Sequence, residues 1–304
     1  MRIIVLPLAP ATASASGSAV REQLTYYHFV IPPDSSKQKR NTLGKWVTTK
    51  SADLWAGLGK APEGTWKRRV FLYGERLIDR LEFEELALKS VDPSLGPTLR
   101  FSDSGKPRPE DHPKIPLIYP PSLGTSPLPH LRSLLERRTP RHRKGFITWL
   151  AISPFTAPFM LVPIIPNLPF FFCAWRSWSH YRAYKASSYL ERFVEQGAIV
   201  PEPSAELDKI YAEYAPRPPP SPSPSAPKPD GPPLSPNTAH TSTPAHLLLS
   251  RHAIPALTRA LQLPPDTSFA ADVLRALEQA RIRLGIPEEV EEAAEEAVSA
   301  EKTR

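Results

Sequence analysis

The sequence predicts a mainly α protein, in which amphipathic helices surround a proline-broken, membrane-inserted helical hairpin, with a small N-terminal β element and a disordered Pro/Ser linker. Three observations lead to this fold class. No charged residue occurs from Gly145 to Trp175. Apolar side chains before and after this run recur every three or four residues, which is the spacing of an amphipathic helix. Proline and serine dominate residues 215–244, and such a segment buries too little apolar surface to fold.

The uncharged run is long enough for one tilted membrane span or a shallow hairpin, because an apolar helix needs about 20 residues to cross the hydrocarbon core. Five prolines interrupt the run, and each removes a backbone donor and disfavours helix in the residue before it. We therefore expect a helix over 146–162, a turn, and a second helix from about Phe170. In lipid, the freed backbone groups need neighbouring protein or water, which favours a packed hairpin. The turn is assigned to Pro163, Pro166, Asn167 and Pro169.

Basic and aromatic side chains flank the run on both sides, as they do where a membrane meets water. The residues assigned to this boundary after the run are Trp175, Arg176, Trp178, His180 and Arg182. Anionic lipid headgroups are the expected partner of the basic residues, and nucleic acid is not. The alternative is a proline-broken helical pair that is buried in the core of a soluble protein.

Arg176 and His180 lie one helical turn apart and share a face of the second helix. One interpretation is a pair that senses cations or protons, since histidine titrates near neutral pH. The other interpretation, which we favour, is that both side chains extend from the membrane boundary toward water.

Residues 3–8 and 24–30 have strand character and predict a small β pair. A two-stranded pair is marginal alone, so it should dock on helices. The segment before Glu22 is rich in alanine and serine and has no acidic residue, which in part resembles a mitochondrial presequence. A cleaved presequence and a short N-terminal strand are thus both open interpretations.

Two basic helices are expected next, over 46–58 and over 66–81. In the second, apolar residues fall at spacings of three and four from Trp66 to Leu81, a strong amphipathic signal. Its apolar face is expected in the protein core, with a position on a bilayer surface as the alternative.

Six regions follow from these patterns. They are an N-terminal helical region with a β pair (1–91), a loop (92–130), the hairpin with flanking basic helices (131–214), the disordered linker (215–244), C-terminal helices (245–286) and an acidic tail (287–304).

Two helix ends are also predicted. Ser204 is expected to cap a helix through Tyr214, and Gly285 is expected to end the last helix.

No motif for catalysis or for a cofactor is apparent. The chain has one cysteine and eight scattered histidines, none of them paired at the spacing of a zinc motif. The segment Gly57–Lys60 resembles part of a phosphate-binding loop but lacks the preceding glycine and the following serine or threonine. We therefore expect no catalytic residue, no cofactor and no metal ligand, and a protein that is not an enzyme.

Several segments resemble the fungal family of mitochondrial K+/H+ exchange-related proteins. The most specific block comprises Pro154–Pro158, Pro166–Phe171 and Trp175–Ala183; further segments are Met1–Pro7, Leu24–His28, Gly64–Ser90 and Val273–Gln279. The resemblance implies a protein of the mitochondrial inner membrane that takes part in potassium/proton exchange and in matrix cation and volume homeostasis. It supplies no established catalytic residues.

One copy of the chain is not expected to form the whole transport pathway, because a proton-coupled exchanger needs an ionisable group inside the membrane and the uncharged run has none. We therefore expect a subunit or regulator, with other exchange-system subunits or a homo-oligomer as partners. The alternative is a membrane-anchored interaction or assembly factor, for example a ribosome tether, whose effect on ion balance is indirect.

Overall fold

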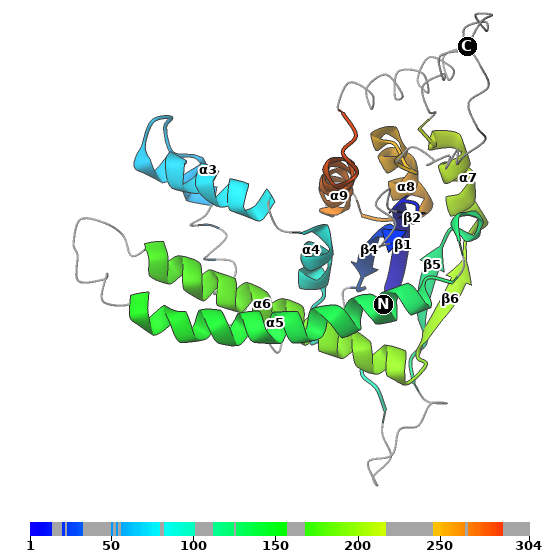
Figure 1. Ribbon diagram of the computed structural model, residues 1–304, viewed down its shortest axis with the longest axis horizontal. Helices are drawn as coiled ribbons and strands as arrows, with labels where there is room; N and C mark the ends of the chain where they lie inside the picture. The colour runs from blue at the N-terminus through cyan, green and yellow to red at the C-terminus, as the bar shows by residue number, and fades with distance from the viewer. Residues whose placement is uncertain are drawn as a thin grey trace, which may run out of the picture. The chain divides into compact units, whose positions relative to one another are not determined.

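The computed structural model is mostly helical with a small mixed sheet (Figure 1), in agreement with the predicted mainly α class. Two compact units are distinguished: unit 1 comprises Met1–Ile4, Tyr27–Tyr119 and Ser126–Glu202, and unit 2 comprises Val5–Tyr26, Pro120–Thr125 and Pro203–Arg304. The residues that the structure describes are 1–13, 20, 21, 23–32, 50, 53, 56–79, 82–100, 112–124, 126–156, 168–216, 246–264 and 267–287.

Four strands form the mixed sheet, in the order β4 (Leu24–Val30), β1 (Arg2–Ala9), β5 (Ile115–Tyr119) and β6 (Ile199–Pro203). β1 and β5 run parallel, with Ile3 opposite Leu117. The predicted strand segments 3–8 and 24–30 are confirmed. The prediction of a loop throughout 92–130 is wrong for β5, a short strand next to prolines, which weaken the strand signal. Two shorter strands, β2 (Thr12–Ala13) and β3 (Val20–Arg21), pair antiparallel.

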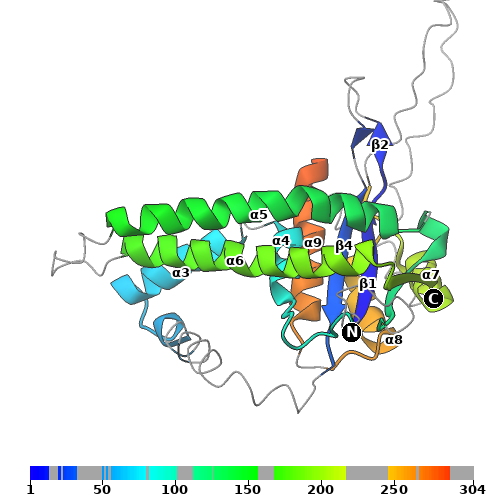
Figure 2. The same cartoon turned by 90° about the horizontal axis from the view of Figure 1, so that it is seen from below.

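The centre of unit 1 is a pair of long helices, α5 (Leu128–Thr156) and α6 (Leu168–Glu195), which lie side by side in both views (Figures 1 and 2). They run antiparallel, since the ring of Phe146 contacts that of Tyr181 and the ring of Trp149 contacts that of Phe172 edge to face. α6 buries small side chains as it packs on α5 and α4: Ala183, Ala186 and Ser187 are fully buried.

The boundaries of these helices differ from the prediction. α5 passes through Pro140 and Pro154 and joins the two helices that were expected before and inside the uncharged run. Of the predicted turn, Pro163, Pro166 and Asn167 lie outside the described residues, and Pro169 is in the first turn of α6, where a missing donor costs little. In the part of the chain that the structure describes, no helix combines the length and apolar character needed to cross a membrane.

Two further helices belong to unit 1, α3 (Trp66–Asp79) and α4 (Phe83–Ser90). α3 confirms the predicted amphipathic helix, but the expectation that its aromatic side chains lie in the core is wrong for Trp66 and Tyr73, which are 55% and 65% exposed. Periodicity identifies an apolar face without showing what covers it. α4 packs on α6 and buries Phe83 and Leu88. The helix predicted over 46–58 lies largely outside the described residues.

The core of unit 2 contains the buried second half of β1, residues 5–9, and helices that bury one face each. As predicted, the Ser204 hydroxyl caps α7 by accepting a hydrogen bond from the Leu207 amide, and Gly285 ends α9 in the left-handed conformation. The predicted linker (215–244) and acidic tail (287–304) lie almost entirely outside the described residues. The α-helices and 3-10 helices of unit 2 are η2 (Pro121–Leu123), α7 (Ala205–Tyr214), η4 (Arg251–Ala253), α8 (Ile254–Ala260) and α9 (Phe269–Leu284).

Candidate functional site

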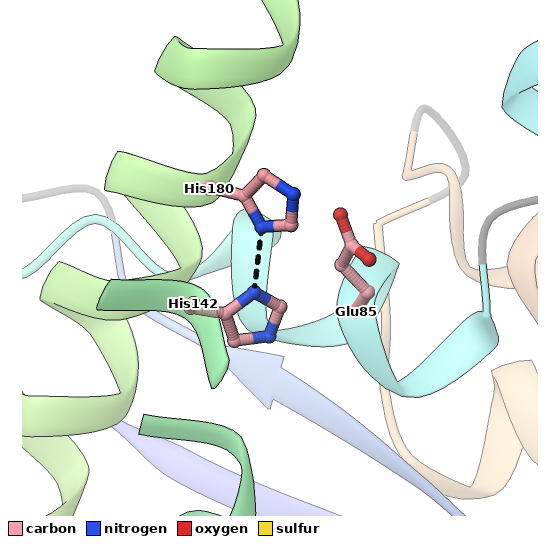
Figure 3. Close-up of side chains that lie close together, drawn as sticks. All are labelled: Glu85, His142 and His180. Atoms are coloured by element: carbon pink, nitrogen blue, oxygen red, sulfur yellow. Dashed lines mark hydrogen bonds between the residues drawn. The ribbon is translucent and has the colours of Figure 1, made fainter. Parts of the chain in front are cut away.

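A buried polar cluster lies between three helices of unit 1 and consists of Glu85 on α4, His142 on α5 and His180 on α6 (Figure 3). All three side chains are buried. The Nδ1 atoms of the two histidines share a hydrogen bond of 3.2 Å, and the Glu85 carboxylate is directed toward the two rings. One nitrogen or oxygen atom from each of the three residues lies within 4.8 Å of the other two.

Gly145 makes room for this cluster. It follows His142 by one turn of α5, and a Cβ atom at this position would lie 2.8 Å from Nδ1 and Cε1 of His180. Real side chains do not approach that closely, so glycine is needed for the imidazole of α6 to reach α5. Gly145 therefore leaves the space beside α5 that the His180 ring occupies.

Two cations neutralise Glu85. Lys89, one turn along α4, lies 3.0 Å from Oε1 of Glu85, and Arg176 of α6 donates to the same oxygen at 2.9 Å. Burial opposes ionisation of Glu85, but the charges of Lys89 and Arg176 outweigh it and hold the pKa of the carboxyl at about 2. Glu85 is therefore a carboxylate at neutral pH, held between α4 and α6.

The two histidines are neutral at neutral pH. Burial lowers the pKa of His142 to about 4 and also lowers the pKa of His180, to which the charge of Arg176 adds. The Nε2 atom of His142 is buried and has no hydrogen-bond partner among the described residues. An unsatisfied buried polar atom costs about 1–3 kcal/mol, so this nitrogen is a feature that the fold itself does not explain.

The structure separates the residues that sequence analysis assigned to one membrane boundary. His180 is 7% exposed and Arg176 is paired with Glu85, so the favoured interpretation, in which both extend into water at that boundary, is wrong for this pair. Trp175 and Trp178 are exposed by 38% and 55%, and exposed Arg182 donates to the backbone oxygen of Lys89 at 2.7 Å.

Sequence reasoning missed Glu85 and His142 as members of a site. His142 lies on α5, His180 lies on α6 and Glu85 lies on α4. No local sequence motif contains all three residues. The one local signal is Gly145, a helix-weakening residue in the middle of α5 and one turn after a histidine.

A second feature of unit 1 is the hairpin apolar surface, a set of exposed apolar side chains on α5 and α6. Phe155 is 80% exposed and Phe171 is 63% exposed, so the alternative of a helical pair covered by a soluble core does not fit the described part of the chain. The set comprises Ile147, Leu150, Ile152, Phe155, Phe171, Trp175 and Trp178. Exposed cations adjoin it in sequence: Arg141, Arg143, Lys144, Arg182 and Lys185.

Comparison with known proteins identifies a family. The family model described as mitochondrial K+-H+ exchange-related matches residues 2–194. An uncharacterized protein of Saccharomyces cerevisiae is 23% identical over 193 residues, which cover 58% of this chain and 60% of that protein. An uncharacterized protein of Schizosaccharomyces pombe is 25% identical over 209 residues, which cover 69% of this chain and 82% of that protein. No solved structure matches the chain.

Proposed function

We propose, because this chain belongs to the family of mitochondrial K+-H+ exchange-related proteins, that it acts at the mitochondrial inner membrane as a subunit or regulator of potassium/proton exchange. In this role it contributes to matrix cation and volume homeostasis. The family match over residues 2–194 is the observation that carries the proposal. It includes α5, α6 as far as residue 194, and the buried polar cluster.

The hairpin apolar surface supports a position at the membrane. Phe155 and Phe171 are exposed near the two helix ends that approach each other, and exposed apolar groups that gather in one region mark a contact with lipid or protein. Cations on the neighbouring turns add about 1 kcal/mol each to binding of an anionic bilayer. The proposal therefore assigns lipid to this surface and anionic headgroups to the cations beside it.

A subunit or regulator fits the chemistry better than a complete exchanger. The run from Gly145 to Trp175, which holds most of the hairpin apolar surface, has no charged residue, whereas ion and proton paths through a membrane are built around ionisable groups. The path would then come from other exchange-system subunits or from several copies of this chain.

Swelling of isolated mitochondria in potassium acetate tests the proposal. Acetic acid carries protons into the matrix, so potassium and water accumulate only if potassium enters in exchange for protons. We expect mitochondria that lack this chain to swell more slowly than the wild type in potassium acetate. Swelling in ammonium acetate, which needs no exchanger, should be unchanged.

Reconstitution separates a subunit from a complete exchanger. Purified full-length chain in potassium-loaded liposomes should give no more potassium/proton exchange than potassium-loaded liposomes without protein. Exchange by this chain alone would overturn the subunit assignment. Normal swelling of the deletion mitochondria, combined with defective translation or complex assembly, would contradict the proposal and favour an interaction factor with indirect effects.

A further inference from the structure

We propose that Glu85, His142 and His180 form a binding site for one divalent transition-metal ion, with zinc as the ion that best suits the three ligands. The inference is independent of the exchange function, because it follows from the side chains that α4, α5 and α6 bring together.

The histidine pair has the spacing of two ligands on one ion. Zinc–nitrogen bonds of about 2.0–2.1 Å in tetrahedral geometry place two ligand nitrogens about 3.3 Å apart. The Nδ1 atoms of His142 and His180 are 3.2 Å apart. The ligand atoms of the whole set lie within 4.8 Å, so binding requires the Glu85 side chain to move closer to the two rings.

The side chains supply the atoms that bind a metal. An ion takes imidazole as the neutral ring and a carboxyl group as the carboxylate, and Glu85 is paired with Lys89 and Arg176, as a carboxylate is. Lys89 and Arg176 both contact Oε1 of Glu85, and we assign Oε2 to the ion. With an ion on both Nδ1 atoms, the hydrogen of the donor ring moves from Nδ1 to Nε2, so both rings carry their hydrogen on Nε2 and no proton remains between them.

The surroundings specify the kind of ion and its remaining ligand. Two imidazoles and one carboxylate suit zinc and its first-row neighbours, whereas hard cations prefer a shell of oxygen atoms. The fourth tetrahedral position then belongs to water, hydroxide or a small anion. Lys89 and Arg176 lower the affinity for a cation but favour an anionic fourth ligand beside them.

A bound ion would hold three helices at one point. Glu85, His142 and His180 come from α4, α5 and α6 and are all buried, which is the setting of a site between helices and not of an exposed acidic patch. We therefore expect the ion to stabilise unit 1.

Metal titration of the purified full-length chain tests the site. After treatment with a chelator and its removal, the chain should bind one equivalent of zinc, measured by elemental analysis. Cobalt(II) in place of zinc should show the visible d–d bands of a low-coordinate site with nitrogen ligands. His142→Asn and His180→Asn should each weaken zinc binding by at least about tenfold, because even the loss of a group that hydrogen-bonds a metal ligand costs about 10–100-fold.

His130→Asn is the matched control, since His130 lies on α5 in the same unit but hydrogen-bonds Tyr27 through Nδ1 at 2.6 Å. Its zinc affinity should equal that of the wild type. Glu85→Gln, which preserves the shape of the side chain, should weaken zinc binding and shift the cobalt bands; it provides the test if a histidine variant fails to fold. Absence of stoichiometric zinc from the folded wild-type chain would overturn the proposal. Unchanged affinity in folded His142→Asn and His180→Asn would also overturn it.

Discussion

Gly145 sets how closely α5 and α6 approach beside the histidine pair. Gly145→Ala improves helix propensity by about 1 kcal/mol, but the new methyl group would lie 2.8 Å from the His180 ring. Because both rings are buried, we expect the clash to prevail and the variant to lose about 1–2 kcal/mol of unfolding free energy, measured by chemical denaturation.

The control is Gly57→Ala, at a helical position where an added Cβ atom has no neighbour within 4 Å. It should be neutral or slightly stabilising. Equal effects of the two substitutions would show that helix propensity alone matters at Gly145, and that the close approach of the ring does not.

Acid should destabilise the metal-free protein through His142. Its pKa is about 4 in the folded chain and 6.5 when unperturbed, so the unfolded state binds more protons between these values. The contribution of the neutral ring is thus fully present above about pH 6.5 and is lost as the pH falls to about 4; its size is roughly 3 kcal/mol.

Urea denaturation in the presence of a chelator, at several pH values from 7 to 4, measures this contribution. His142→Asn should show a flatter dependence of stability on pH than the wild type over this window. Parallel curves for the two proteins would contradict the folded-state assignment of a neutral, buried imidazole.

At the residue scale, sequence patterns identify single positions but not the groups they meet. The sequence identifies His180 as a candidate but not its partners, because His142 lies on the neighbouring helix α5 and Glu85 lies on α4. Ser204 and Gly285, by contrast, act on their own helix ends, and their roles as cap and terminator were both predictable.

At the scale of elements, the N-terminal cap of α7 offers a local test. The Ser204 hydroxyl accepts a hydrogen bond from the Leu207 amide at 3.3 Å. This contact fixes the first turn of α7, and the position of that turn determines which residues of the helix are buried. Ser204→Ala should destabilise the protein by about 1 kcal/mol, whereas Ser204→Asn, which keeps a cap acceptor, should be nearly neutral. Thermal unfolding followed by circular dichroism checks both, and equal loss in the two variants would contradict the capping role.

The hairpin apolar surface predicts binding to lipid vesicles. Phe155→Glu and Phe171→Glu should each lower binding by tenfold or more, since burial of a phenylalanine side chain contributes about 1.5–3 kcal/mol. Flotation with vesicles of neutral lipid, with and without anionic lipid, measures this, and binding should be stronger with anionic lipid.

Ile282→Glu is the control for this measurement, because Ile282 of α9 is 64% exposed, close to the value for Phe171, but belongs to unit 2. It should bind vesicles like the wild type. If all three variants bind equally, lipid does not contact the hairpin apolar surface.

Elements with a strong periodic pattern were predictable, and short ones that depend on neighbours were not. Apolar spacing located α3, α7 and α9, and the uncharged run located the facing ends of α5 and α6. β5 was missed because its few residues lie among prolines and become a strand through pairing with β1. α5 also passes through Pro154, although a proline inside a helix normally disfavours the preceding turn.

At the scale of the whole molecule, the family match and the apolar hairpin lead to the same prediction about where the protein acts. The match covers the residues of α3, α4, α5 and most of α6, and the exposed apolar side chains lie within it. Unit 2, which contains α7, α8 and α9, falls largely beyond residue 194. A truncation that ends after the hairpin would remove part of this unit and is therefore a poor test of function; point variants in the full chain are preferable.

The most direct test of the central claim is complementation of potassium acetate swelling in mitochondria that lack the chain. The wild-type chain and Ile282→Glu should restore the rate, and the double variant Phe155→Glu with Phe171→Glu should not, at equal protein levels. Restoration by the double variant would show that the hairpin apolar surface is not needed for exchange. Normal swelling without any copy of the chain would contradict the link to potassium/proton exchange itself.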